Sequence, residues 1–192
     1  MDNRLPQELI KKAVTGNTNA FETIVREYQS FAYALSFRFL RQQEEAEDVV
    51  QEAFIRLWKN MYKYKPEIKL STWLYRIITN LCLDYLKSNY ARQKINQQDM
   101  KLLSEMKSYD QADKALRAEE LNTLIQEIAS ELTPKQKAVF ILRDLEGLSV
   151  EEVCSILSLS AGSIKSNLYY ARKFVSEKLK MVYQTTDKVI TI

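Results

Sequence analysis

The residue types in one stretch of this 192-residue chain, 44–94, could bind two chemically different partners. The stretch begins with acidic residues and then becomes basic. Aromatic residues lie among the basic ones: Tyr62, Tyr64, Trp73, Tyr75, Tyr85 and Tyr90. Lysine and arginine neutralise phosphates, and aromatic rings stack on unpaired bases. We therefore expect an acidic surface for a basic protein, followed by a surface for a nucleic acid.

The acidic residues lie on a predicted helix, 44–62, whose apolar residues recur at i, i+3 and i+4. The apolar residues should face a core and are Ala46, Val49, Val50, Ala53, Phe54, Leu57, Trp58 and Met61. Glu47, Asp48, Gln51 and Glu52 project from the edge of that stripe, in the first half of the helix, where the helix dipole favours negative charge. An ordinary solvated acidic face would show the same pattern, so this pattern alone leaves both interpretations open.

A second helix is predicted from about Ser71 to Lys94, with Ser71 or Thr72 as its N-cap. The loop before it, 63–70, contains one proline and three lysines. The loop and the helix together favour a binding site for single-stranded nucleic acid. Its residues would be Lys63, Tyr64, Lys69, Ser71, Thr72, Arg76 and Asn80. We expect Trp73 to be the buried anchor of this helix. The alternative is an amphipathic helix whose lysines only provide solubility.

A helix-turn-helix pattern is predicted near the C-terminal end. Ser149 and Glu152 form a capping box at the start of its first helix, and a tight turn follows at 158–160. The last helix, 161–182, has an outer face of short hydrogen-bonding groups and long cations: Ser163, Lys165, Ser166, Asn167, Tyr170 and Lys173. Such side chains bind base edges and phosphates. A plain solvent-exposed face is the alternative.

The composition predicts an all-α fold, because three glycines and three prolines are too few for the turns of a β-sheet protein. We expect a helical domain over 1–94, a polar linker over 95–116, a helix-turn-helix domain over 117–183 and a tail over 184–192. Charge is segregated along the chain, because 59–98 and 132–192 are basic whereas 99–131 is acidic. Two basic blocks on either side of an acidic one favour two separate nucleic-acid contacts.

Several classes of function are disfavoured by the composition. The chain has no histidine and two cysteines, Cys82 and Cys154, so the usual zinc sites cannot form and the commonest general base is missing. A glycine-rich phosphate loop is absent as well. We therefore expect neither an enzyme nor a cofactor. Because nothing resembles a signal peptide or a membrane span, a cytoplasmic protein with reduced cysteines is expected.

Three segments resemble one protein family. EAEDVVQEAFIRLW (45–58) is similar to the helix with which bacterial sigma factors bind core RNA polymerase. LSTWLYRIITN (70–80) is similar to the promoter-melting helix of the small extracytoplasmic-function class. The segment from Leu132-Thr133-Pro134 to Lys180 resembles the domain of the same class that binds the upstream promoter element. The first two segments match one domain of the family and the third matches the other, and the two domain matches in tandem are far more specific than either alone.

The resemblance implies a factor that binds core RNA polymerase, directs it to promoters and opens the minus-ten region. By position in the motif, Asp48, Gln51, Glu52 and Phe54 would contact the polymerase clamp. The segment 63–80 would read and open the minus-ten element, and the last helix would read the minus-thirty-five element. The resemblance also implies an anti-sigma protein, which in this class is commonly bound to the membrane.

The chain departs from the family pattern at two positions and one segment. Leu70 stands where the class often has an aromatic residue, and Asn167 stands where a cation is common. The linker is too short and polar for the extra middle domain of primary sigma factors. The main alternative is a helix-turn-helix regulator that is not a polymerase subunit, although such a protein has no need of the acidic helix. A nuclease or ligase is a weaker alternative, because the chain has no histidine, no phosphate loop and no carboxylate cluster in a glycine-turn pocket.

Overall fold

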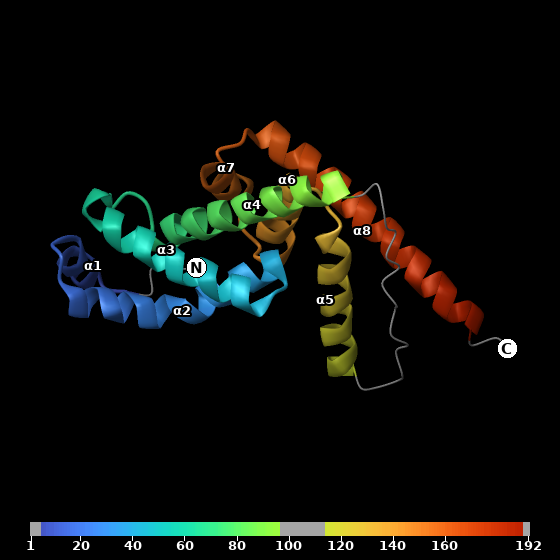
Figure 1. Ribbon diagram of the computed structural model, residues 1–192, viewed down its shortest axis with the longest axis horizontal. Helices are drawn as coiled ribbons and strands as arrows, with labels where there is room; N and C mark the ends of the chain where they lie inside the picture. Colours follow the sequence, from blue (N-terminus) through green and yellow to red (C-terminus); the bar gives the residue numbers. More distant parts are fainter. Residues whose placement is uncertain (1–4, 97–113, 190–192) are drawn as a thin grey trace.

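The computed structural model describes residues 5–96 and 114–189, and every regular element in these two ranges is helical (Figure 1). The predicted all-α fold is therefore confirmed. None of the helices in the described ranges has both the length and the apolar character that crossing a bilayer requires.

The N-terminal domain is a bundle made of α1 (Gln7–Val14), α2 (Thr18–Leu40), α3 (Gln43–Asn60), a 3-10 turn η1 (Met61–Lys63) and α4 (Leu70–Asn96). The Asn17 side chain caps α2 by accepting the backbone N–H of Ala20 at 2.9 Å. Arg41 ends α2 in the left-handed region, at φ 60°, and α3 then packs back against α2. The apolar stripe predicted for 44–62 faces a core that includes Ile24, Leu35, Phe39, Leu57, Leu74 and Ile78.

The C-terminal domain contains α5 (Lys114–Ser130), α6 (Pro134–Phe140), a π-helical turn η2 (Ile141–Leu145), α7 (Val150–Leu157) and α8 (Ala161–Val189). The predicted capping box is present, because Ser149 accepts the backbone N–H of Glu152 and the Glu152 carboxylate accepts that of Ser149. Ser158 ends α7 in the left-handed conformation, at φ 54°. The pair α7 and α8 is the predicted helix-turn-helix.

The end of α6 departs from regular α-helical geometry. The chain widens into η2, where the backbone N–H of Glu146 bonds to the carbonyl of Ile141 at 2.9 Å, five residues back. Gly147 follows at φ 68°, a conformation that glycine adopts without strain. The extra residue in this turn changes the direction of the side chains that follow it.

The helices reach further than the predicted domain boundaries. Helix α4 continues to Asn96 and α5 begins at Lys114, so each enters the segment expected to be a linker. The remaining linker residues, 97–113, lie outside the described residues. Helix α8 continues to Val189, through most of the predicted tail.

The two domains pack against each other in this structure. Helix α4 lies alongside α6 and α7 (Figure 1). The buried apolar residues of both domains form one continuous cluster. The helix with the predicted nucleic-acid residues therefore contacts the helix-turn-helix directly.

Candidate polymerase and nucleic-acid interfaces

The predicted polymerase-binding residues of α3 divide between its surface and the core. Asp48 and Gln51 are exposed and Glu52 is half-buried. Because these three positions are spaced i, i+3 and i+4, they share one face. Glu52 pairs with Arg56 at 2.6 Å, which leaves the face acidic on its N-terminal side. The Phe54 side chain is 7% exposed and packs in the core, where it holds α3 in place.

An open pocket of about 360 Å³ lies between the end of α3, the loop after η1 and the start of α4. The Tyr64 and Trp73 rings stack in it with their centroids 5.9 Å apart and their planes at 25°. Trp73, expected as a buried anchor, is half-buried, and its remaining surface lines the pocket. The full lining is Arg56, Asn60, Lys63, Tyr64, Lys65, Ile68, Trp73, Arg76 and Ile77. This combination of rings and cations suits an unstacked base and its phosphates.

The predicted minus-ten residues do not all reach this pocket. Lys63, Tyr64 and Arg76 line it. Lys69 and Asn80 are exposed outside the lining, and Asn80 lies one turn after Arg76 along α4. Thr72 is half-buried and Ser71 is 3% exposed, so Ser71 lies inside the bundle and presents no surface to a ligand.

Burial also sets the protonation of the pocket tyrosine. Partial burial, together with the nearby Glu67 carboxylate, raises the pKa of Tyr64 above its ordinary value. Its hydroxyl therefore remains a hydrogen-bond donor at neutral pH and carries no negative charge that would repel phosphate.

The outer face of α8 carries the predicted upstream-element residues. Lys165, Ser166, Tyr170 and Lys173 are exposed, whereas Ser163 and Asn167 are half-buried. The Asn167 amide nitrogen donates to the carbonyl of Ser163 at 2.7 Å, so this side chain lies along the helix.

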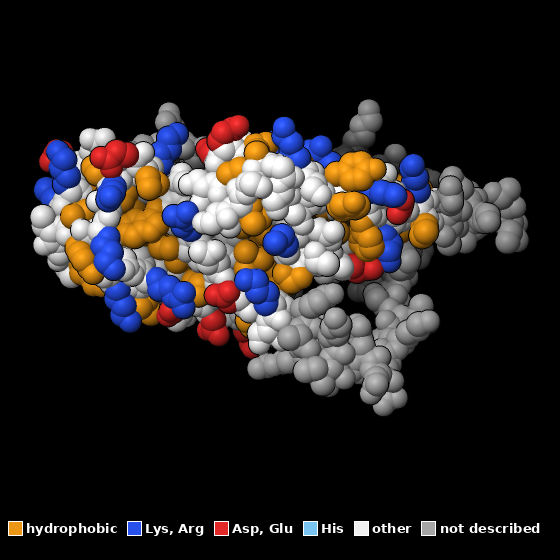
Figure 2. Space-filling view, turned by 90° about the horizontal axis from the view of Figure 1, so that it is seen from above, with side chains coloured by type: hydrophobic (Ala, Val, Ile, Leu, Met, Phe, Trp, Pro, Cys, Tyr) orange, Lys and Arg blue, Asp and Glu red, His pale blue; other side chains and the backbone are white. Residues whose placement is uncertain are grey.

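On the face of the molecule seen in Figure 2, basic side chains are spread along the surface and apolar side chains emerge between them.

Beside Tyr170, α8 carries an exposed aromatic residue that the sequence pattern did not single out. Tyr169 is 63% exposed and its ring meets that of Tyr170 edge to face, with the centroids 5.4 Å apart. It lines a shallow pocket together with Lys165 and Lys173. The signal was present in the sequence, because Tyr169 lies four residues from each of these lysines and so shares their face.

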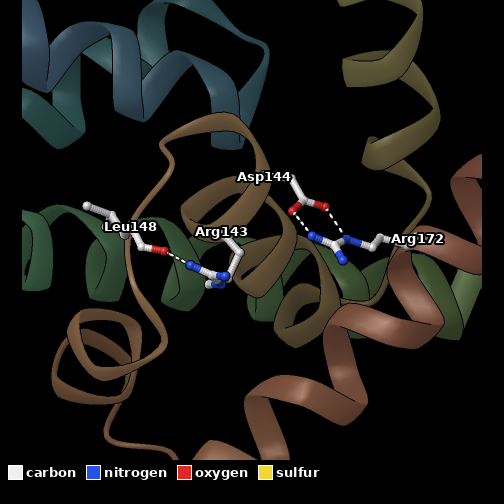
Figure 3. Close-up of polar contacts among 4 residues, drawn as sticks. All are labelled: Arg143, Asp144, Leu148 and Arg172. Atoms are coloured by element: carbon white, nitrogen blue, oxygen red, sulfur yellow. Dashed lines mark hydrogen bonds and ion pairs between the residues drawn. The ribbon is translucent and has the colours of Figure 1, made fainter.

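Two arginines fix the helix-turn-helix internally (Figure 3). The Arg172 guanidinium on α8 donates to both carboxylate oxygens of Asp144 in η2, at 2.8 and 2.6 Å. Such bidentate pairs have defined geometry as well as strength. Arg143 donates to the carbonyl of Leu148, beyond the Gly147 turn. Arg172 therefore orients the recognition helix and is already occupied by a carboxylate.

The chain matches two family models in the expected order. Residues 24–92 match Sigma-70 region 2, and residues 122–175 match Sigma-70, region 4. The chain is 32% identical over 178 residues to the ECF RNA polymerase sigma factor SigW of Bacillus subtilis, covering 89% of this chain and 95% of the relative. It is 26% identical over 180 residues to the RNA polymerase sigma-H factor of Pseudomonas aeruginosa, covering 91% of this chain and 93% of that protein.

Two solved structures share the fold. CnrH, in complex with the cytosolic domain of CnrY, gives a TM-score of 0.62 at 21% identity, over 90% of this chain and 96% of CnrH. The sigma factor RpoE of Bartonella quintana, solved with the anti-sigma factor NepR, gives 0.61 at 20% identity, over 83% of this chain and 96% of RpoE.

A region 2 bundle followed by a region 4 helix-turn-helix defines a sigma factor of RNA polymerase. With its similarity to SigW over nearly the whole chain, the protein belongs to the extracytoplasmic-function (ECF) class of these factors. The family expected from the sequence is thus confirmed, and the alternative of a regulator that does not act as a polymerase subunit is not favoured.

Proposed function

We propose that this ECF sigma factor binds core RNA polymerase through α3 and captures the minus-ten element in the Tyr64–Trp73 pocket. The observation that carries the proposal is the pocket itself, where stacked rings and four cations converge at the C-terminal end of α3. The upstream element is read by α8. The factor works in the cytoplasm, performs no covalent catalysis and needs no cofactor. The likeness to CnrH and RpoE supports a dedicated anti-sigma protein as a further partner.

Strand opening follows from the chemistry of this pocket. A duplex hides its base faces, so a protein that captures an extruded base shifts the equilibrium towards the open form. Tyr64 and Trp73 provide the stacking surface, while Lys63 and Arg76 neutralise the adjacent phosphates. Each stacked base contributes about 1–3 kcal/mol. A few captured bases therefore offset much of the cost of separating a short segment of duplex.

The direct test is run-off transcription with core polymerase on a library of randomised promoters. The chain should select a subset of templates and start transcription at fixed positions on them. A pull-down with core polymerase distinguishes the alternative, because a helix-turn-helix regulator that is not a polymerase subunit would bind DNA without binding the core enzyme.

Reversing the charge of the α3 face should weaken polymerase binding. The double variant Asp48→Lys with Glu52→Lys places cations against a basic clamp surface and should cost about 2 kcal/mol or more of binding free energy. Glu22→Lys on α2 is a matched control, because Glu22 is also exposed and pairs with Arg26 at i+4, at 2.6 Å, as Glu52 does with Arg56. Titration of labelled core polymerase measures both. Equal affinities in the double variant and the control would refute the assignment of α3.

Two substitutions on α8 should separate phosphate contacts from base contacts. Lys173→Ala should weaken binding to all upstream elements about equally and lower the salt dependence by roughly one unit. Asn167→Ala should instead change which sequences are preferred. Holoenzyme binding to a library of upstream elements at several salt concentrations measures both effects, with Lys12→Ala on α1 as a control. A uniform loss of affinity in both variants would contradict the base-reading role of Asn167.

A further inference from the structure

A second hollow in the N-terminal domain shares Tyr64 with the Tyr64–Trp73 pocket. It lies between α1 and the loop after η1, and its volume of about 350 Å³ is close to the 360 Å³ of the first pocket. This α1 groove is lined by Gln7, Ile10, Lys11, Val14, Thr15, Tyr64 and Pro66. Its α1 residues precede the segment 24–92 that matches Sigma-70 region 2, so the family match carries no role for them.

The sequence of α1 places the lining residues on one face of the helix. Gln7, Ile10, Lys11 and Val14 recur at i, i+3, i+4 and i+7, which is the spacing of neighbours on a helix surface. Ile10 is 2% exposed, and Val14 is half-buried and packs against the core. Helix α1 also contacts η1, so the wall of the groove is held in place by the fold of the domain.

The α1 groove combines apolar walls with polar groups at its edge. Aliphatic side chains of α1 and a proline form the walls beside the Tyr64 ring. The side chain of Gln7 is exposed and offers both a donor and an acceptor. The Thr15 hydroxyl donates to the carbonyl of Lys12 at 2.8 Å and can still accept a hydrogen bond. Flat apolar faces with a few hydrogen-bonding groups at the edge suit a heterocyclic base.

The surroundings of the α1 groove carry a positive charge. Helix α1 and the segment 61–69 together contribute five exposed lysines: Lys11, Lys12, Lys63, Lys65 and Lys69. Their two carboxylates offset this charge only in part, since Glu8 pairs with Lys11 at 2.9 Å and Glu67 lies near Tyr64. At the left end of Figure 2, where α1 and η1 lie, basic side chains surround apolar ones. Such a surface attracts the phosphates of a nucleic acid.

Continuity with the Tyr64–Trp73 pocket identifies the occupant of the groove. A strand whose base is captured in that pocket continues along the surface, and Tyr64 belongs to both hollows. We propose that the α1 groove is a second subsite for single-stranded DNA, which takes an unpaired base flanking the minus-ten element. Gln7 contacts the edge of this base and Lys11 its phosphate. The proposal rests on the function proposed above for the Tyr64–Trp73 pocket and extends promoter recognition to α1.

Selection of forked DNA by the holoenzyme tests the subsite. The probe is a duplex that ends in a single-stranded non-template segment, with the minus-ten positions and the flanking positions randomised. The bound fraction is sequenced for the wild type and for Gln7→Ala, Lys11→Ala and Val14→Trp. Lys12→Ala is the matched control, because Lys12 is an exposed lysine of α1 outside the lining of the groove. Titration of labelled core polymerase measures the binding of each variant to the core enzyme.

The wild type should select bases at the minus-ten positions and at one flanking position. Gln7→Ala should remove the flanking preference, a change of about tenfold for a lost amide contact, and keep the minus-ten preference. Lys11→Ala should weaken binding to all forks about equally and lower the salt dependence by roughly one unit. Val14→Trp fills the groove and should weaken fork binding about tenfold, as expected for the loss of one stacked base. If Val14→Trp fails to fold, the two variants at exposed positions retain the test.

The outcomes separate the subsite from the proposed function. Loss of the flanking preference in Gln7→Ala, with unchanged binding to core polymerase, supports the subsite. An unchanged flanking preference in Gln7→Ala overturns the subsite, as does its absence from the wild type, and both leave the Tyr64–Trp73 pocket assigned as long as minus-ten bases are selected. Weaker binding of the groove variants to core polymerase also overturns the subsite, because a segment of polymerase would then occupy the groove. A wild type that selects no minus-ten bases refutes the proposed function, and the subsite with it.

Discussion

Replacing Arg76 and Asn80 together with alanine should abolish permanganate reactivity of thymines in the minus-ten region. Arg76 lines the Tyr64–Trp73 pocket, and Asn80 is exposed one turn after it on α4, outside the lining. Without them the captured strand loses a phosphate contact and a base contact, and each base that is no longer captured forfeits on the order of 1–3 kcal/mol of stacking. Binding to core polymerase and to the upstream element should remain intact, since α3 and α8 are unchanged.

A template with a pre-melted bubble should largely restore transcription by this double variant, because the bubble removes the step that requires capture. Lys87→Ala is a suitable control, as Lys87 is exposed further along α4 and pairs only weakly with Asp84, at 3.7 Å. If the bubble does not rescue transcription, the defect lies in another step and the pocket is misassigned.

The two single variants should behave differently in the free protein. Arg76→Ala removes a pocket cation and also the hydrogen bond from Arg76 to the carbonyl of Ser155 in α7, so it should loosen the contact between the two domains while it impairs melting. Asn80→Ala should impair melting alone. The radius of gyration of the free protein should therefore rise in Arg76→Ala and stay unchanged in Asn80→Ala.

Replacing Lys137 with methionine should raise the free energy of unfolding by about 3 kcal/mol at pH 7. Burial, reinforced by the nearby Arg41, lowers the pKa of Lys137 from 10.5 to about 8, although Cys82 acts in the opposite direction. Each unit of that shift corresponds to about 1.36 kcal/mol of penalty on the charged form. Methionine keeps most of the apolar stem and removes the charge. Urea unfolding of the two full-length proteins measures the difference.

The pH dependence of that difference identifies its cause. Between pH 8 and 10.5 the unfolded chain holds a proton on Lys137 that the folded chain has released, so the stability of the wild type rises with pH in this window. Below pH 8 both states are protonated and the penalty is constant. The gap between variant and wild type should therefore shrink to a small remainder by about pH 10. A gap of equal size at pH 7 and pH 10 would show that packing, and not charge, is responsible.

Local signals in the sequence predicted most of the fold. Ser149 and Glu152 are a short-range signal for a helix start, and their capping box forms as expected. The apolar stripes predicted the helices and their buried faces. The π turn at 141–145 could not be predicted, because a hydrogen bond to the fifth residue back leaves no distinct mark in an apolar period.

The candidate sites were predicted less completely than the helices. Phe54 and Ser71 belong to segments that resemble family motifs, but a motif position does not tell which way a side chain points, and both lie in the core. Arg38 and Glu146 form the domain contact although they lie 108 residues apart in the chain. Each looks like an ordinary surface residue within its own helix or turn, so no local pattern could pair them.

The short turn at 141–146 connects the position of α8 to the contact between the two domains. Asp144 holds α8 through Arg172, and two residues later Glu146 holds the first domain through Arg38 and Tyr75. A displacement of α8 would therefore act on the domain contact through a span of two residues. By thermodynamic reciprocity, a weaker contact between the domains must favour upstream DNA by the same factor with which upstream DNA weakens that contact.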